Sequence, residues 1–240
     1  MECDGVEMSE TVIRDEVWAS IDDLEVGNEL RDEQAEKIDA WLEDRHGSFT
    51  ASNFGKLMQR GRAKDEEFGQ TAMAYIFDTA AEVVGSHKFG FSSKPTDWGN
   101  DNEQAAKEAY EKVTGNVVDY DSHRFMVLNE YIGGSPDGLV GSDGVTEFKC
   151  PYDPGKHIQW TVADEVPAEH IWQCVGHCLV TNRQWCDFVS FDPRIEGPLR
   201  LFIKRYERDS RVDQLKERLE LAVDRLQAIC RVLMDKAKEY

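Results

Sequence analysis

The chain has 240 residues, of which 40% are hydrophobic, so it holds enough apolar material for one large globular domain. No run approaches 18 consecutive apolar residues, which excludes a membrane-spanning helix from the prediction. The formal net charge is -19 at pH 7, the opposite of the basic surface that most nucleic-acid-binding proteins carry.

The acidic excess is concentrated at the start of the chain. Residues 1–40 hold 14 Asp and Glu against 3 Lys and Arg, a net charge of -11, so the other 200 residues carry only -8. We interpret residues 1–40 as a peripheral, partly helical acidic extension, with adaptation to high salt and a regulatory tail as alternatives. Part of the remaining negative charge is expected to be offset by a bound cation, so the charge does not exclude a nuclease core.

The cysteine pattern bears on the compartment. The six cysteines are scattered, and their spacing does not predict a disulfide framework. The opening residues lack the basic stretch followed by an apolar core that a secretory signal requires. We therefore expect reduced thiols in a cytoplasmic protein.

Helical patterns dominate the first half of the chain. Residues 29–44 carry apolar side chains at about a 3.6-residue period, and residues 71–84 predict a buried helix. Between them, Thr50 or Ser52 is expected to cap the start of another helix. A further helix is predicted over residues 98–115, where a glycine ends it.

Strands and helices alternate in the second half. Short segments of strand-like pattern occur at residues 117–128, 131–135, 185–191 and 199–206. Helices are predicted at residues 154–165 and 167–182, and a long C-terminal helix within residues 207–240 carries one apolar stripe. This order favours an α/β domain over residues 41–206 with a mixed sheet covered by helices. The C-terminal helix is expected to pack on this core or on a neighbouring subunit.

Residues 135–149 read Ser-Pro-Asp-Gly-Leu-Val-Gly-Ser-Asp-Gly-Val-Thr-Glu-Phe-Lys and predict a β-hairpin. Side chains alternate along a strand, so Glu147 and Lys149 share one face and Phe148 points to the other. Asp137 can converge on the first face. Two carboxylates and an ammonium group around one point can hold Mg²⁺ and activate water against a phosphodiester. Taken alone, the pattern is equally compatible with a turn aspartate and a Glu/Lys pair on a solvated strand.

Four blocks of residues occur in order between residues 41 and 195. They are Arg45 with Phe-Thr-Ala-Ser at 49–52, Trp98-Gly99 with Glu103, residues 134–139 with 147–151, and Gln173 ahead of residues 185–193. Together they resemble lambda exonuclease and the YqaJ-like viral recombinase nucleases of the PD-(D/E)xK superfamily. The resemblance implies a restriction-endonuclease-like α/β fold, with a mixed central sheet flanked by helices.

The resemblance also implies an activity. It is that of a Mg²⁺-dependent 5′→3′ exonuclease, which digests one strand of linear double-stranded DNA to mononucleotides. The remaining 3′ single strand would serve a single-strand annealing protein. Two Mg²⁺ ions are implied, with Mn²⁺ as a substitute. A ring-shaped homotrimer is expected, as a phage or prophage protein in the host cytoplasm, with no membrane partner.

The same resemblance implies roles for individual residues. The implied metal ligands are Asp137, Glu147, the backbone carbonyl of Phe148 and, directly or through water, Glu103. Lys149 would orient or deprotonate the attacking water, and Gln173 would contact water or the scissile phosphate. The implied site for the terminal 5′-phosphate consists of Arg45, Ser52 and Ser135, with a helix starting near Ser52 that turns its N–H groups toward the anion.

Three alternatives remain open from the residues alone. One is a nicking or restriction-type endonuclease of the same superfamily, and another is a non-catalytic acidic protein that mimics DNA. The third is a zinc site on the helix that carries His170, Cys174, His177 and Cys178. Because these residues lie on one helix and no knuckle from a second element accompanies them, buried thiols are the default expectation.

Overall fold

A five-stranded mixed sheet forms the centre of the protein. The computed structural model describes residues 45–61, 66–85, 94–120 and 124–239. The strand order is β2-β5-β6-β7-β8, in which β6 and β7 are parallel and all other neighbours are antiparallel. The five strands are β2 (Val118–Tyr120), β5 (Gly138–Val140), β6 (Gly144–Lys149), β7 (Trp185–Phe191) and β8 (Leu201–Glu207).

A second, three-stranded sheet lies beside the first, with the strand order β1-β4-β3. Its strands are β1 (Phe49–Thr50), β3 (Met126–Asn129) and β4 (Ile132–Gly134). β1 pairs parallel to β4, and β4 pairs antiparallel to β3. Because β4 leads directly into β5, the short segment between the two sheets carries Ser135 and Asp137.

Helices of very different length surround the sheets. They are α2 (Phe54–Leu57), α3 (Gln70–Val83), α4 (Lys94–Thr114), α5 (Pro154–Ala163), α6 (Ile171–Thr181) and α7 (Arg211–Ala237), with 3-10 turns η1 (Ala51–Asn53) and η2 (Gly197–Arg200). Gly115 follows α4 with φ of +74°, a left-handed conformation that glycine adopts without a Cβ clash. In the part of the chain that the structure describes, no helix is both long and apolar enough to cross a membrane.

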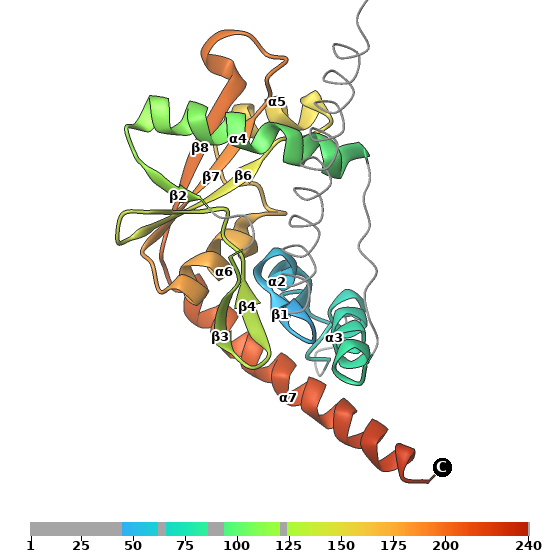
Figure 1. The fold of residues 1–240 in the computed structure, drawn as a ribbon. Helices are drawn as coiled ribbons and strands as arrows, with labels where there is room; N and C mark the ends of the chain where they lie inside the picture. The colour runs from blue at the N-terminus through green and yellow to red at the C-terminus, as the bar shows by residue number, and fades with distance from the viewer. Residues whose placement is uncertain (1–44, 62–65, 86–93, 121–123, 240) are drawn as a thin grey trace, which may run out of the picture. The chain divides into compact units, whose positions relative to one another are not determined.

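The five-stranded sheet is covered on both faces. α4 lies across one face, whereas α6 lies on the other, with α7 packed against α6 (Figure 1). Successive residues of β7 serve the two sides: Phe188 belongs to the larger core with α6 and α7, and Val189 to the smaller core with α4. Such a three-layer arrangement gives both apolar faces of the sheet a partner.

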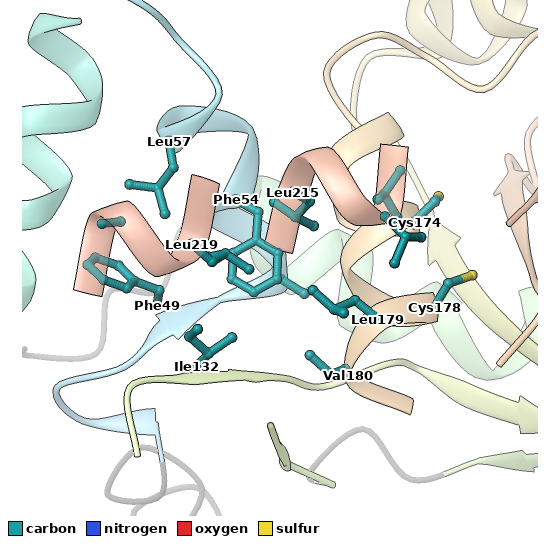
Figure 2. Packing of buried hydrophobic residues seen from close by; sticks show 14 of the residues in the cluster. Phe49, Phe54, Leu57, Ile132, Cys174, Cys178, Leu179, Val180, Leu215 and Leu219 are labelled. Carbon is teal, nitrogen blue, oxygen red and sulfur yellow. The ribbon is translucent and has the colours of Figure 1, made fainter. Parts of the chain in front are cut away.

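The larger core joins elements that are far apart in the chain. Figure 2 shows Phe54 of α2 among Leu179 of α6 and Leu215 and Leu219 of α7. All four side chains are buried, and Gly176 of α6 permits the close approach. A Cβ at that glycine would lie 2.5 Å from Cδ2 of Phe54. This packing holds α6 firmly against the sheet, where its polar residues meet β6.

The structure confirms the predicted α/β class with a mixed sheet and covering helices. The strand predicted at residues 185–191 is β7, with the same ends. Two helices begin at other residues than expected: α4 starts at Lys94, and α6 starts only at Ile171 because residues 167–170 form a turn. The predicted strand at 117–128 is interrupted, with β2 and β3 at its two ends. The helix expected at 29–44 and the acidic extension at 1–40 lie outside the described residues.

Candidate active site

Glu147 is the centre of a buried polar network. Side chains at odd positions of β6 face α6, so the Glu147 carboxylate lies under that helix, and it is only 1% exposed. Oε1 of Glu147 accepts from Nζ of Lys149 and, over 2.6 Å, from Nε2 of Gln173. Its Oε2 lies 2.7 Å from Nε2 of His177. One carboxylate therefore meets three potential donors from two elements.

These neighbours keep Glu147 ionised. Burial by itself would raise the pKa of this carboxyl group, but the Lys149 ammonium group and the hydrogen bond with His177 oppose it. The net result lowers the pKa of Glu147 to about 2. Burial also disfavours the charged form of Lys149, and the carboxylates outweigh it, so the pKa of Lys149 rises. At neutral pH the buried Glu147 carboxylate thus forms an ion pair with the half-buried ammonium group of Lys149.

Asp137 approaches the same place from the segment between β4 and β5. Its Oδ2 accepts from the backbone N–H of Phe148 over 2.6 Å. Burial, and then repulsion by Glu147, raises the pKa of Asp137 well above its ordinary value, and Glu103 adds to the repulsion. Two carboxyl groups this close cannot both ionise easily without a cation.

The remaining side chain of the hairpin packs away from this cluster. Phe148 lies edge-to-face against Tyr110 of α4, with ring centroids 5.9 Å apart, in the smaller core. The predicted alternation of Glu147 and Lys149 on one face and Phe148 on the other is therefore confirmed. The proposed ligand role of the Phe148 carbonyl stays a prediction.

Glu103 lies near the cluster on α4. Its charge contributes to the raised pKa of Asp137 and to that of Cys150, whose thiol pKa burial and the nearby carboxylates raise to about 12. Among the described residues, no three His, Cys, Asp or Glu side chains are arranged so that they already enclose a metal ion. Asp137 and Glu147 are therefore the candidate oxygen donors, and the charge of Glu103 acts on Asp137.

The donor chemistry nevertheless fits Mg²⁺. This ion prefers oxygen ligands and retains several waters, so it is usually bound through one or two carboxylates rather than by a closed protein cage. Asp137 and Glu147 supply such carboxylates in one cluster, and a divalent cation would relieve the repulsion between them that raises the pKa of Asp137. The residues present are thus suited to hold the metal.

The residues predicted for a terminal phosphate are only partly together. Nη1 of Arg45 donates to Oγ of Ser135 over 3.4 Å. Burial lowers the pKa of Arg45, and electrostatic interactions with Tyr75 and Glu147 offset part of that decrease. Ser52 instead forms a hydrogen bond with Thr50, in which the two hydroxyl oxygens are 3.3 Å apart.

The prediction that Thr50 or Ser52 caps a helix is only partly correct: Thr50 precedes η1, but its side chain makes no capping hydrogen bond. η1 and the single turn of α2 follow, and neither the Thr50 nor the Asn53 side chain caps a backbone N–H group. The hydroxyl groups of Thr50 and Ser52 accept from Nδ2 of Asn53 instead, over 3.1 and 3.4 Å. A side chain that bonds its neighbours locally competes with the helix, so no extended helix N-terminus faces an anion here.

The residues weighed as zinc ligands have other neighbours. His170 lies between Trp160 and Phe188, with ring centroids 5.4 and 5.3 Å away. Burial, and then the Lys149 charge, lowers the pKa of His170 to about 4. Cys174 and Cys178 are buried in the larger core.

His177 is the site residue for which the sequence predicted no catalytic role. The sequence did indicate that His177 lies beside Gln173, because the two residues are four positions apart on one helix and therefore share a face. Nothing in that spacing identifies Glu147 as the common partner, 30 residues away in the chain.

Comparison with known proteins gives a consistent result. The family model described as the YqaJ-like viral recombinase domain matches residues 40–184. No curated protein sequence matches the chain. The structure resembles an alkaline exonuclease, LHK-Exo, from Laribacter hongkongensis, with a TM-score of 0.74 and 27% identity over 84% of this chain and 98% of that one.

Two further solved structures are similar. LHK-Exo in complex with dAMP gives a TM-score of 0.73 and 28% identity over 84% of this chain and 98% of that one. A phage-related exonuclease from Haemophilus somnus 129PT gives 0.64 and 21% identity over 78% and 97%, and at that identity shows the fold alone. The restriction-endonuclease-like fold implied by the sequence is thereby confirmed.

Proposed function

The chain belongs to the YqaJ-like viral recombinase family, and from this premise we propose that it is a Mg²⁺-dependent 5′→3′ exonuclease acting on linear double-stranded DNA. It would release mononucleotides from one strand and leave a 3′ single strand for a strand-annealing protein. The similarity to an alkaline exonuclease supports the nuclease activity. The polarity, the products and the annealing partner are part of the proposal.

The observation that carries this proposal is the convergence of Asp137, Glu147 and Lys149. Lys149 donates to Glu147, and Asp137 is bonded to the backbone between them. A surface Glu/Lys pair beside a turn aspartate would be solvated, whereas this Glu147 is buried and joined to α6. Burying a charged group is expensive unless it is paired, and such clusters gather at functional sites.

Asp137 and Glu147 would hold the metal, with the Phe148 carbonyl as a further ligand and Glu103 acting directly or through water. When bound, two Mg²⁺ ions, or Mn²⁺ in their place, would polarise the phosphodiester and lower the pKa of a bound water. The residues of the chain supply the geometry, since Gln173 holds Glu147 at one oxygen over 2.6 Å.

Lys149 would orient the attacking water and stabilise the charge that develops on the phosphate. Of the two roles predicted for it, the ammonium role is the better supported, because its pKa is raised in the presence of the carboxylates. Gln173 lies beside the same carboxylate and would contact water or the scissile phosphate.

The terminal 5′-phosphate would be bound by Arg45 and Ser135, with Ser52 nearby on η1. A guanidinium group gives paired, charge-assisted hydrogen bonds to a phosphate. Arg45 is held at 3.4 Å from Ser135, two residues before Asp137, which places the anion site next to the carboxylates. This arrangement would set where the strand end stops relative to the metal.

A homotrimeric ring is the assembly we propose. The second half of α7 leaves apolar side chains uncovered in the single chain, among them Val232 and Met234 at 56% and 62% exposure. The first half of the same helix is core. An exposed apolar patch of this kind is typical of a subunit contact.

Digestion of DNA substrates that differ in one feature tests the function. Linear duplexes with and without a 5′-phosphate are incubated with and without Mg²⁺, and the two strands are resolved separately. Loss of 5′ label as mononucleotides from linear duplex alone supports the proposal. Cleavage of a covalently closed circle would indicate an endonuclease. A protein that digests none of the substrates and shows no saturable Mg²⁺ binding would favour the DNA mimic. Asp137→Ala and Lys149→Ala should abolish digestion without unfolding the chain.

A further inference from the structure

We propose that His177 is a positioning residue that holds the Glu147 carboxylate in the orientation required for metal binding. This inference rests on the proposed function, because it assigns Glu147 as a ligand. None of the sequence blocks that carry the family resemblance includes His177.

Two side chains of one helix hold the Glu147 carboxylate. Gln173 and His177 are one turn apart on α6, and each contacts a different oxygen of Glu147, over 2.6 and 2.7 Å. The side chains of His177 and Glu147 are both 1% exposed. Two donors on a rigid helix therefore stop the carboxylate from rotating about its last torsion, which is otherwise a soft one.

The direction of the hydrogen bond follows from the other partners of Glu147. Nζ of Lys149 and Nε2 of Gln173 can only donate, so the carboxyl group acts as an acceptor at this site. Nε2 of His177 is then the donor to Oε2. The other ring nitrogen, Nδ1, is buried and has no hydrogen-bond partner among the described residues. The Nε2–H tautomer leaves Nδ1 without a hydrogen, so the ring has no buried N–H group that lacks a partner.

The unpaired nitrogen argues against a packing role. Small residues lie around it: a Cβ on Gly134 would be 3.7 Å from Nδ1 and 2.9 Å from Cβ of Ala51. A buried polar atom without a partner destabilises the fold, so an apolar side chain would suit this place better if packing were the sole demand. The hydrogen bond to Glu147 therefore explains why a histidine lies here.

The three hydrogen bonds to Glu147 leave one acceptor site of the carboxylate open for a metal. An ionised carboxylate has about four acceptor sites, and Lys149, Gln173 and His177 occupy three of them. The site that remains is on Oε2, the oxygen that His177 holds. Outer-shell partners of this kind typically change metal affinity or activity by about 10–100-fold when removed.

Three variants separate this role from simple packing. His177→Leu removes the donor, and His177→Gln retains an amide nitrogen at about the reach of Nε2. His157→Gln is the control, because His157 is equally buried but is bonded to Ser190 and to the Leu199 carbonyl group, each over 2.8 Å, and not to Glu147. Mn²⁺ binding by each full-length protein is measured without DNA by electron paramagnetic resonance, followed by nucleotide release at varied Mn²⁺.

We expect His177→Leu to bind Mn²⁺ about 10–100-fold more weakly than the wild type and to need correspondingly more Mn²⁺ for activity. His177→Gln should recover most of the affinity, and His157→Gln should bind like the wild type while its melting temperature changes. Equal Mn²⁺ affinity of a folded His177→Leu variant and the wild type would overturn the inference and leave the proposed function intact. A wild type that neither binds Mn²⁺ nor digests DNA would overturn both.

A measurement on the unchanged protein covers the case in which His177→Leu fails to fold. In ¹⁵N-histidine-labelled wild type, the resonances of His177 are assigned by comparison with His177→Gln. The Nε2–H tautomer supports the inference. A proton on Nδ1 instead would mean that His177 does not donate to Glu147, and would overturn it.

Discussion

The backbone N–H of Phe148 donates to Oδ2 of Asp137 over 2.6 Å, and this bond closes the candidate site across eleven positions of the chain. It brings the turn that precedes β5 onto the end of β6, where Glu147 and Lys149 lie. The side chain of Phe148 is meanwhile anchored on Tyr110 of α4. One residue thus links the carboxylate cluster to the smaller core.

Replacing Asp137 by Asn should separate stability from activity. The amide oxygen of Asn can still accept from Phe148, but the residue no longer carries a carboxyl group whose pKa burial raises. A raised folded pKa means that ionisation opposes folding, so the wild type loses stability as pH rises above about 3.8, the ordinary value. Metal-free Asp137→Asn should therefore melt at a higher temperature than the wild type at pH 8, while nucleotide release falls by more than about 100-fold.

Calorimetry with and without Mg²⁺ checks this expectation. Mg²⁺ should raise the melting temperature of the wild type and leave that of Asp137→Asn almost unchanged, since binding to the folded state alone stabilises it. A variant that melts lower than the wild type, or that still responds to Mg²⁺, would contradict the assignment of Asp137.

His170 should make the protein less stable in mild acid. Its folded pKa is lowered to about 4 from 6.5, chiefly by burial between aromatic rings, so the folded state favours the neutral imidazole. The resulting stability is fully present above about pH 6.5 and is lost as pH falls toward 4, by at most about 3 kcal/mol. His170→Phe keeps a ring beside Trp160 and Phe188 and removes the titration.

Urea unfolding between pH 7.5 and 4.5 measures the difference. The free energy of unfolding of His170→Phe should fall less over this range than that of the wild type. Parallel curves for the two proteins would show that His170 does not contribute to the acid sensitivity.

Arg45 should determine the preference for a phosphorylated end. Arg45→Ala removes the guanidinium group that lies 3.4 Å from Ser135, and with it the paired charge-assisted bonds available to a terminal phosphate. The ratio of kcat/KM on 5′-phosphorylated and 5′-hydroxyl duplexes should fall by about 10-fold or more, the equivalent of a charge-assisted hydrogen bond of roughly 1.5–3 kcal/mol. Ser52→Ala is the comparison variant and should lower this ratio less than Arg45→Ala, because Ser52 is bonded to Thr50 and not to Arg45. A ratio that stays constant in Arg45→Ala would place the phosphate elsewhere.

The two halves of α7 should respond differently to the same substitution. Leu219 is 1% exposed and lies in the larger core, whereas Leu233 is 39% exposed. Leu219→Ala should lower the free energy of unfolding by about 2–5 kcal/mol because it leaves a cavity. Leu233→Ala should change it by less than about 0.5 kcal/mol in the single chain. If the protein assembles through α7, sedimentation will show that Leu233→Ala weakens the oligomer, and unchanged association would exclude this surface.

Local periodicity made part of this protein predictable. The alternation of Glu147, Phe148 and Lys149 follows from the two-residue repeat of a strand, and the structure places these side chains on the expected faces. The stripe of the C-terminal helix likewise follows from the helical repeat, and its first half is core. Such patterns are written in neighbouring residues, so no knowledge of distant contacts is needed.

Contacts between distant segments required the tertiary structure. Glu147 meets Gln173 and His177 because the connection between parallel strands β6 and β7 runs through α6 and packs that helix back on the sheet. The same is true of Tyr110, whose hydroxyl group donates to Asp187 over 2.7 Å, 77 positions away. In contrast, the only partly correct prediction of a helix capped by Thr50 or Ser52 reflects local side-chain bonds that outcompete a helix in a four-residue segment. Residue spacing alone predicts which side chains share a face of one strand or helix. The partners of a buried carboxylate depend instead on which elements the crossover between β6 and β7 packs against the sheet.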